Sequence, residues 1–220
     1  MSLPGFFLAH KHEVLTLTGE HLWLVGVSML LAVSIGVPLG ILLSRRPALK
    51  SLILGTNNIM QTIPSLALFG LLLPVPWIGA RADRLAILAL TLYALLPVVR
   101  NTYTGIAGVD APVREAAIGM GLTSRQLLWH VELPLASDVI VAGIRTATVI
   151  TVGVATIAAA IGAGGLGEFI FRGLAMVDNN VILAGAIPAA LMALCADFVL
   201  GLIQRSLVRT RVRTPVRTHH

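Results

Sequence analysis

Residues 110–134 form a conspicuous polar stretch between long apolar runs. Six of its residues have a distinctive spacing, namely Glu115, Ala116, Ala117, Gly121, Leu133 and Pro134. One carboxylate, small residues and a proline do not make a catalytic set, but they suit contact between two protein surfaces. A chain this apolar has no need of a polar loop for its own packing, so the stretch is predicted to bind another protein.

The first half of this stretch predicts a short helix. Pro112 suits the first turn of a helix, and Asp110 just before it is placed to cap the free backbone N–H groups. Glu115 is expected to add negative charge near this end of the helix, where the helix dipole favours it. Gly121 is expected to end the helix, because glycine interrupts helices and favours turns.

The second half predicts another short helix over residues 125–132. Thr123 or Ser124 is placed to cap it, and Leu133-Pro134 is expected to end it. One face of this helix is apolar and contains Leu127, Leu128, Trp129 and Val131. Residues 110–134 are therefore predicted to be a helix–turn–helix knob, too polar for lipid and too small to be a domain. We call them the knob.

Asp197 is an acid inside the apolar run 181–203. An ionisable residue in a membrane span is a functional candidate, which here means attracting a cationic solute or relaying a proton. The structural alternative is that Asp197 pairs with a neighbour such as Arg145 or Arg100 and holds the last span in place. The position of Asp197 near one end of its run favours the structural alternative.

Several polar side chains interrupt the other apolar runs and are candidates for lining a solute path. They are Asn57, Asn58, Gln61, Thr62, Tyr93, Thr146, Thr148 and Thr151. Tyr93 could offer the face of its ring to a quaternary ammonium group. Hydrogen bonding between helices is an equal explanation for all eight residues.

Two nucleotide motifs and a metal site are excluded. Residues 162–167 match GxGxxG, but a dinucleotide site needs a preceding strand in a soluble βαβ unit, and an apolar run precedes this match. These glycines are predicted to form a tight turn after a span. No GxxxxGK[ST] occurs in the 220 residues, so ATP hydrolysis is assigned to a partner. His10, His12 and His21 are predicted to lie at the membrane surface, and the one cysteine, Cys195, makes no metal site.

The composition is that of a membrane protein. The chain is 56% hydrophobic and 12% charged, against about 25% charged in soluble domains. Its mean hydropathy is +0.90 and its isoelectric point about 10.7. A basic soluble protein would bind nucleic acid, but here the arginines lie in short loops and a tail, where they orient membrane helices. No nucleic-acid partner is expected.

A membrane span needs about 20 mainly apolar residues. Five runs qualify, namely residues 22–43, 52–73, 85–106, 139–163 and 181–203. The second is polar in its first half and contains Pro64, so that half is expected to face a pathway or a neighbouring helix rather than lipid. The domain prediction is an extracytoplasmic or interfacial segment 1–21, a membrane domain 22–204 with the knob inside it, and a basic cytosolic tail 205–220.

Lysine and arginine in the short loops set the orientation. With five spans, one side carries the larger share, namely Arg45, Arg46, Lys50, Arg100, Arg114, Arg125 and the arginines of the tail. The other side carries Lys11, Arg81, Arg84 and Arg172. The knob and the C-terminus are therefore predicted to be cytosolic, and the N-terminus to lie outside.

At the knob the chain resembles the permeases of ABC importers. Glu115-Ala116-Ala117, Gly121, Val131 and Leu133-Pro134 match the spacing of the family's EAA motif, with Val131 where isoleucine is usual. The resemblance implies that the knob forms the coupling helices, which sit in a groove of a cytosolic ATPase. It also implies the type I importer permease (MetI-like) fold, all helical with about five spans, in a bacterial inner membrane.

Four further segments resemble the osmoprotectant branch of this family, namely residues 61–67, 95–103, 161–167 and 185–188. The resemblance implies import of glycine betaine, choline, carnitine or a similar quaternary ammonium compound. The expected complex contains two permease subunits, identical or paralogous, two ATPase chains that bind ATP and magnesium, and a separate extracytoplasmic binding protein. This chain is expected to be no enzyme and to bind no cofactor itself.

Two alternatives to this function are considered. A small ion-coupled carrier would use Asp197 as its coupling carboxylate, but such carriers commonly show internal repeats, and five spans do not divide evenly. The knob would also have no role in such a carrier. The other alternative is an ABC permease for another small solute such as an amino acid.

Overall fold

The computed structural model describes residues 3–212, and every regular element in that range is helical. The helices are α1 (Leu3–Ala9), α2 (Lys11–Arg45), α3 (Lys50–Thr62), α4 (Ser65–Leu72), α5 (Ala82–Ala107), α6 (Ala111–Gly119), α7 (Ser124–Leu127), α8 (Leu133–Ala155), α9 (Gly167–Met176) and α10 (Asn179–Val212). Pro47–Leu49 and Ile157–Ile161 are short 3₁₀ turns, and Leu128–Glu132 is a π-helical segment. The predicted all-α fold is confirmed.

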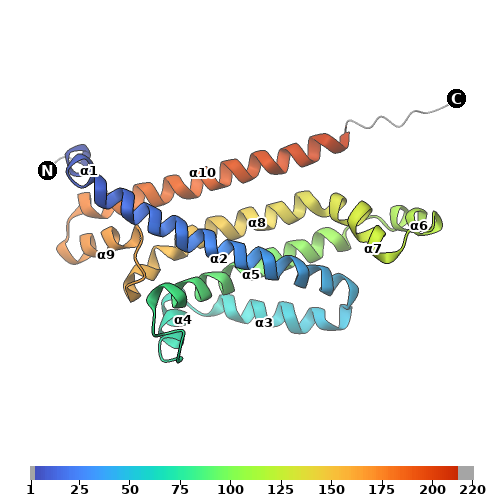
Figure 1. Ribbon diagram of the computed structural model, residues 1–220, viewed down its shortest axis with the longest axis horizontal. Helices are drawn as coiled ribbons and strands as arrows, with labels where there is room; N and C mark the ends of the chain where they lie inside the picture. The colour runs from blue at the N-terminus through green and yellow to red at the C-terminus, as the bar shows by residue number, and fades with distance from the viewer. Residues whose placement is uncertain (1–2, 213–220) are drawn as a thin grey trace.

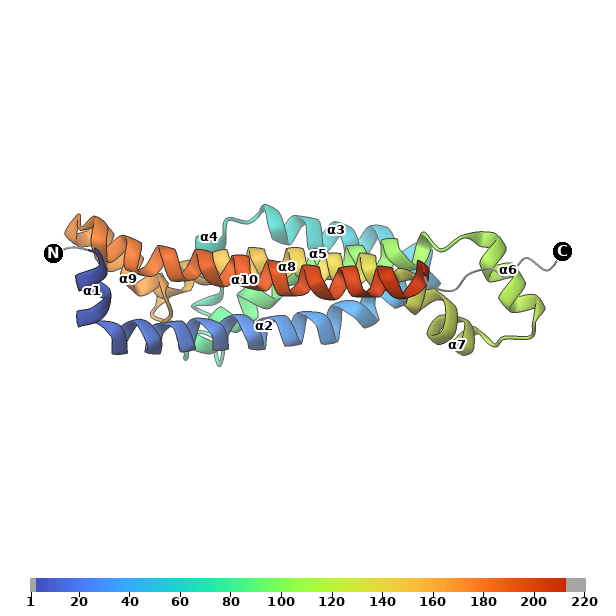
Figure 2. The ribbon, with the colours of Figure 1, turned by 90° about the horizontal axis from the view of Figure 1, so that it is seen from above.

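Four helices within the described range are long and apolar enough to cross a membrane. They are Lys11–Arg45, Ala82–Ala107, Ser124–Ala155 and Asn179–Leu207. Figures 1 and 2 show them running side by side along the long axis of the molecule. At about 1.5 Å of rise per residue, each exceeds the roughly 30 Å of a bilayer's hydrocarbon core.

The predicted span over residues 52–73 is a broken helix. It consists of α3 and α4, which meet at Ile63-Pro64. Ile63 is extended, with φ −72° and ψ 123°. Proline has no N–H for the helical ladder and disfavours a helical conformation in the residue before it, so Pro64 accounts for the break.

The first and last long helices extend past the domain boundaries predicted from the sequence. Helix α2 begins at Lys11 and has no break near residue 21, so only α1 lies apart from it, across the end of the bundle (Figure 2). Helix α10 continues through residue 205 to Val212. Residues 213–220, the distal part of the predicted tail, lie outside the described residues.

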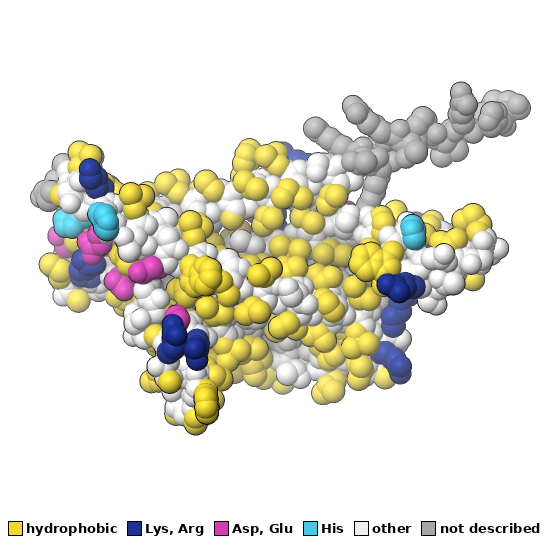
Figure 3. Space-filling model, viewed as in Figure 1, with side chains coloured by type: hydrophobic (Ala, Val, Ile, Leu, Met, Phe, Trp, Pro, Cys, Tyr) yellow, Lys and Arg dark blue, Asp and Glu magenta, His cyan; other side chains and the backbone are white. Residues whose placement is uncertain are grey.

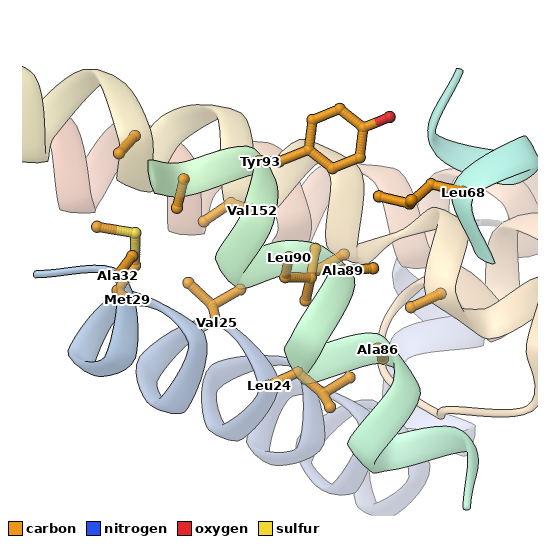
Figure 4. Packing of buried hydrophobic residues seen from close by; sticks show 14 of the residues in the cluster. Leu24, Val25, Met29, Ala32, Leu68, Ala86, Ala89, Leu90, Tyr93 and Val152 are labelled. Carbon is orange, nitrogen blue, oxygen red and sulfur yellow. The ribbon is translucent and has the colours of Figure 1, made fainter. Parts of the chain in front are cut away.

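Helix α5 is the centre of the bundle and packs between α2 and α8. Leu24, Val25, Leu90 and Val152 belong to the buried cluster that joins these helices (Figure 4). A Cβ atom on Gly36 would lie 2.8 Å from Val98 Cγ1, and one on Gly40 would lie 2.5 Å from Thr102 Cβ. The GxxxG pair of α2 therefore allows close approach to α5, as small residues do in membrane helices.

The two ends of the bundle differ in charge. Figure 3 shows hydrophobic side chains across the middle and Lys and Arg gathered, without neighbouring acids on this face, at the end that carries α6 and α7. The described part of α10 ends on the same side, and α1 and α9 lie at the opposite end (Figure 1). By the positive-inside rule, we expect the end that carries the knob to be cytosolic and the N-terminus to lie outside.

Candidate functional site

The first helix of the knob, α6, ends at Gly121 in the way the sequence predicts. Gly121 has φ +85°, the left-handed conformation that glycine adopts without strain. Gly121 N donates to Ile118 O at 2.9 Å, and Leu122 N donates to Ala117 O at 3.2 Å. These two bonds form a Schellman cap, which satisfies the last carbonyl groups of α6. Asp110 occupies the N-cap position, but its side chain makes no cap hydrogen bond.

The second helix of the knob is capped by Thr123 but does not end at Pro134. Thr123 and Gln126 form a reciprocal capping box. The helix then runs on into the membrane as part of α8. Leu133 N bonds to Leu128 O, five residues back, in the π-helical segment Leu128–Glu132. This wider turn admits Pro134 near the start of α8 without ending the helix, so the predicted end at Leu133-Pro134 is wrong.

A buried acid at the base of the knob was missed by the sequence reasoning. Glu132 is completely buried, and both Arg45 guanidinium Nη atoms donate to its carboxylate. Arg114 Nε lies 3.1 Å from Glu132 Oε1, and Arg114 also donates to the carbonyl of Ile106. One carboxylate thus joins α2, α6 and the π-helical segment. We call Arg45, Arg114 and Glu132 the triad.

The sequence contained a weak indication of Glu132 and none of its two partners. Glu132 is an acid one residue before the apolar Leu133 and close to the start of a span, where an unpaired charge is costly. Arg45 and Arg114 were assigned only to orientation. Nothing in their separation along the chain indicates that the three side chains meet.

The knob exposes apolar side chains at the cytosolic end. Ile118 is 58% exposed, Met120 75% and Trp129 60%, whereas Ala117 and Leu127 are buried. Glu115, Ala116 and Gly121 are also on the surface. Several large apolar side chains exposed on one small polar segment are consistent with a binding surface. The burial of Leu127 shows that part of the predicted apolar face packs inward.

Three of the predicted path residues line hollows at the cytosolic half of α5. Asn58 of α3 lines a hollow of about 240 Å³, and Gln61 and Thr146 line a second of about 330 Å³. Arg100 and Leu96 of α5 line both. Since a water molecule occupies about 30 Å³ in the liquid, each hollow has room for a small solute.

The remaining path candidates lie elsewhere. Tyr93 and Thr151 are buried: the Tyr93 hydroxyl donates to the carbonyl of Ile63, and Thr151 donates to Ala147 O at 2.7 Å. Figure 4 shows Tyr93 within the core cluster. Thr148 donates to Ile144 O within its own helix. Asn57 and Thr62 lie on α3 beside Asn58 and Gln61, but neither lines the hollows described above.

Asp197 is paired. Arg145 Nε lies 2.5 Å from Asp197 Oδ1, and Arg145 Nη2 lies 2.6 Å from Oδ2. This bidentate ion pair joins α8 to α10. The sequence left two interpretations of Asp197 open, namely a functional acid in a pathway and a structural acid paired with a neighbour. The geometry matches the structural alternative, with Arg145 as the partner.

The glycine-rich segment 162–167 is held at the outer end of the bundle by α2. Gly165 N donates to Glu20 Oε2 at 3.0 Å. His21 lies beneath the segment, completely buried, with Nε2 3.1 Å from Val152 O. The prediction that His21 lies at the surface is wrong, because α2 continues through this position and turns the ring towards α8.

Replacing Gly165 with alanine is expected to lower the melting temperature of the purified protein. Gly165 has φ +84°, and an added Cβ would lie 3.1 Å from His21 Nδ1. The left-handed conformation alone costs a non-glycine residue about 1–2 kcal/mol. Gly153→Ala is the matched control, since Gly153 is helical and a Cβ there meets nothing within 4 Å. An unchanged melting temperature for Gly165→Ala would contradict the strain argument.

The sequence profile of one family matches residues 36–213. Its description is "Binding-protein-dependent transport system inner membrane component". The chain belongs to this family. It is therefore a membrane component of an ABC importer, and such an importer also contains an ATPase and a substrate-binding protein.

This permease is similar to several characterised relatives. It is 41% identical to the carnitine transport permease protein OpuCB of Listeria monocytogenes over 96% of both chains. It is 46% identical to the glycine betaine/carnitine/choline transport system permease protein OpuCD of Bacillus subtilis, over 86% of this chain and 81% of the relative. It is 43% identical to the osmoprotectant import permease protein OsmW of Salmonella typhimurium, over 97% of this chain and all of the relative.

The fold of the permease matches solved importers. Its structure has a TM-score of 0.81 to a chain of the MetNI methionine ABC transporter in an inward-facing conformation, with 25% identity over 94% of this chain and 99% of that one. A chain of an amino acid ABC transporter gives a TM-score of 0.68 at 18% identity, over 94% and 99% of the two chains. The predicted MetI-like fold is confirmed.

Proposed function

We propose that this permease imports quaternary ammonium osmoprotectants, such as glycine betaine, carnitine or choline, into the cytosol. The observation that carries the proposal is the 41–46% identity, along most of the chain, to permeases named for these solutes. The residues that line the two hollows beside Arg100 lie within residues 36–213, which match the family profile. The hollows beside Arg100 are of a size that suits such small molecules.

A separate ATPase is proposed to supply the energy and to bind ATP and magnesium. The exposed apolar side chains of the knob, Ile118, Met120 and Trp129, support a protein partner at this surface. The chain has no phosphate-binding GxxxxGK[ST] sequence with which to bind ATP itself. Two ATPase chains, each receiving one knob, complete the cytosolic side of the proposed complex.

A second permease subunit, identical or paralogous, is proposed to cover helix α3. None of the residues of α3 is buried within this chain, although the helix lies in the predicted span 52–73 and carries Asn57, Asn58 and Gln61, of which Gln61 Nε2 donates to Tyr93 O. Lipid cannot satisfy such polar groups, so protein or a water-filled path must surround them. The solute-binding protein is proposed to dock at the opposite end, near residues 162–167.

In the proposed cycle, ATP binding closes the two ATPases, moves the two knobs towards each other and opens the path to the outside. Hydrolysis returns the permease to the inward-facing state. The ATPases can shift this equilibrium only through contacts that differ between the two states, and the knob supplies those contacts.

Uptake in cells tests the proposal. The chain is expressed with the ATPase and the binding protein of its neighbouring reading frames in a strain that lacks osmoprotectant uptake. Uptake of labelled glycine betaine, carnitine, choline and methionine is then measured. We expect uptake of at least one quaternary ammonium solute, and we expect arsenate, which depletes ATP, to abolish it. Uptake of methionine alone would identify an amino-acid permease instead.

The same experiment separates the ion-coupled carrier from the ABC importer. Uptake that survives ATP depletion and collapses with an ionophore would overturn the proposal. The Arg145–Asp197 pair argues against that carrier, because Asp197 already has a cationic partner. A coupling carboxylate must be free to exchange its proton or ion.

A further inference from the structure

Arg100 is a cation without a described partner at membrane depth. The structure places Arg100 inside α5 rather than in a loop, about 8 Å along the helix axis from the helix midpoint. With α5 centred in the bilayer, this position is within the half-thickness of the hydrocarbon core, about 15 Å. Arg100 makes no hydrogen bond or ion pair with any residue that the structure describes, in contrast to Arg45, Arg114 and Arg145. A guanidinium at this depth needs water or an anion.

The hollows beside Arg100 have room for water and for a small anionic group. Arg100 lines the two hollows of about 240 and 330 Å³ described above. The polar groups that share these hollows with it are Lys50, Asn58, Gln61, Asn101, Tyr103, Thr104 and Thr146. Arg100 therefore faces a polar space large enough for a small anionic group.

The ring of Tyr103 is next to Arg100 and already holds a cation. Tyr103 lies one turn further along α5, so the two side chains share a face of the helix, with Cβ atoms about 5–6 Å apart. Lys50 Nζ of α3 lies 4.8 Å from the centre of the Tyr103 ring. All three residues line the smaller hollow. The Tyr103 ring thus has an ammonium group over it that lines the same hollow.

We propose that Arg100 and Tyr103 form a transient solute site, in which Arg100 binds a carboxylate and the Tyr103 ring binds a quaternary ammonium group in place of Lys50. The site suits a zwitterion whose two charges are a few bonds apart, as in glycine betaine or carnitine. Choline has the ammonium group but no carboxylate and uses only half of the site. This inference rests on the proposed function and names the preferred solute class.

The site is expected to be weak, because a transport path must release what it binds. The hollows are open, and Lys50 competes for the ring of Tyr103. One or two charge-assisted contacts then discriminate among solutes without trapping them. Tight recognition is left to the separate binding protein.

Cysteine protection tests the site without requiring transport. Asn58→Cys is introduced with Cys195→Ser, and its labelling by N-ethylmaleimide is followed in membrane vesicles that contain the assembled complex. We expect millimolar glycine betaine to slow labelling more than choline does. In an Arg100→Gln background, the betaine concentration for half protection should rise about tenfold or more. Equal protection by the two solutes, or protection by neither, would overturn the inference.

Matched variants separate recognition from folding. Arg100→Lys keeps the charge and should retain most of the protection, and Tyr103→Phe keeps the ring and should do the same. Tyr103→Leu should remove protection by both solutes. If the wild-type permease imports osmoprotectants but betaine does not protect the introduced thiol of the Asn58→Cys variant, this inference fails and the proposed function stands. If it imports none of them, the proposed function fails.

Discussion

Glu132→Gln is expected to reduce solute uptake about tenfold or more while ATP hydrolysis by the complex continues. Breaking the interactions of a buried charge costs about 1–3 kcal/mol, and each 1.4 kcal/mol corresponds to a factor of ten. Apart from Ala117, the residues of α6 are partly or fully exposed, and Arg114 attaches this helix to the bundle through its ion pair with Glu132 and its hydrogen bond to the carbonyl of Ile106. Glu132→Gln removes the ion pair and leaves only the hydrogen bond to Ile106, so ATPase movement is expected to shift α6 with less movement of the spans.

The measurement is the ratio of solute imported to ATP hydrolysed in proteoliposomes that contain the whole complex. Glu13→Gln is the control, because Glu13 pairs with Arg172 at the outer end, where both side chains are partly exposed. That variant should keep a normal ratio. A Glu132→Gln permease that is inserted normally and has a wild-type ratio would show that the triad does not transmit the movement.

Gly121→Trp is expected to abolish both uptake and the stimulation of ATPase activity by loaded binding protein, while the permease still inserts in the membrane. No atom lies within 4 Å of a Cβ on Gly121, so the large side chain projects from the knob without disturbing the chain's own packing. It would occupy the surface proposed to enter the ATPase groove. Pull-down of the ATPase by the variant should fail.

Gly121→Ala is the control that separates the effect of the large tryptophan side chain from the effect of backbone strain at this position. Alanine bears the same left-handed cost, about 1–2 kcal/mol, without the bulk of tryptophan. It should retain ATPase binding with a modest loss of stability. Glu115→Lys is an independent test of the same surface. Glu115 is exposed on α6, so this substitution reverses the charge at that position without affecting a buried contact. Normal uptake by a well-expressed Gly121→Trp variant would overturn the proposed role of the knob.

Local sequence patterns predicted the long helices, the orientation, the end of α6 and the family. Apolar runs indicated the four long helices, whereas the fifth run, residues 52–73, is a broken helix. The positive-inside rule predicted the orientation, because it depends on composition over short stretches of chain. Gly121 indicated the end of α6, since the need for a left-handed residue is a property of one position. The EAA spacing predicted the family, which is confirmed.

Other predictions depended on helix geometry and were wrong or incomplete. Pro134 was expected to end a helix, but a π-helical turn absorbs it. Pro64, in contrast, does break its span. Both prolines lack an N–H, and which outcome occurs depends on whether the neighbouring backbone can rearrange its hydrogen bonds around it.

Only the tertiary structure decided which ionisable groups meet. Glu132 binds Arg45, 87 positions away in the sequence, and Asp197 binds Arg145, 52 positions away. His21 is buried because α8 packs over it. Arg100 differs from the other arginines because it lies inside α5 and lines two hollows there. The sequence by itself determined the membrane class, the family and the end of α6 at Gly121, because these follow from local composition and spacing. Charge pairing and burial required the packed helices, because they depend on which faces of distant helices are brought together.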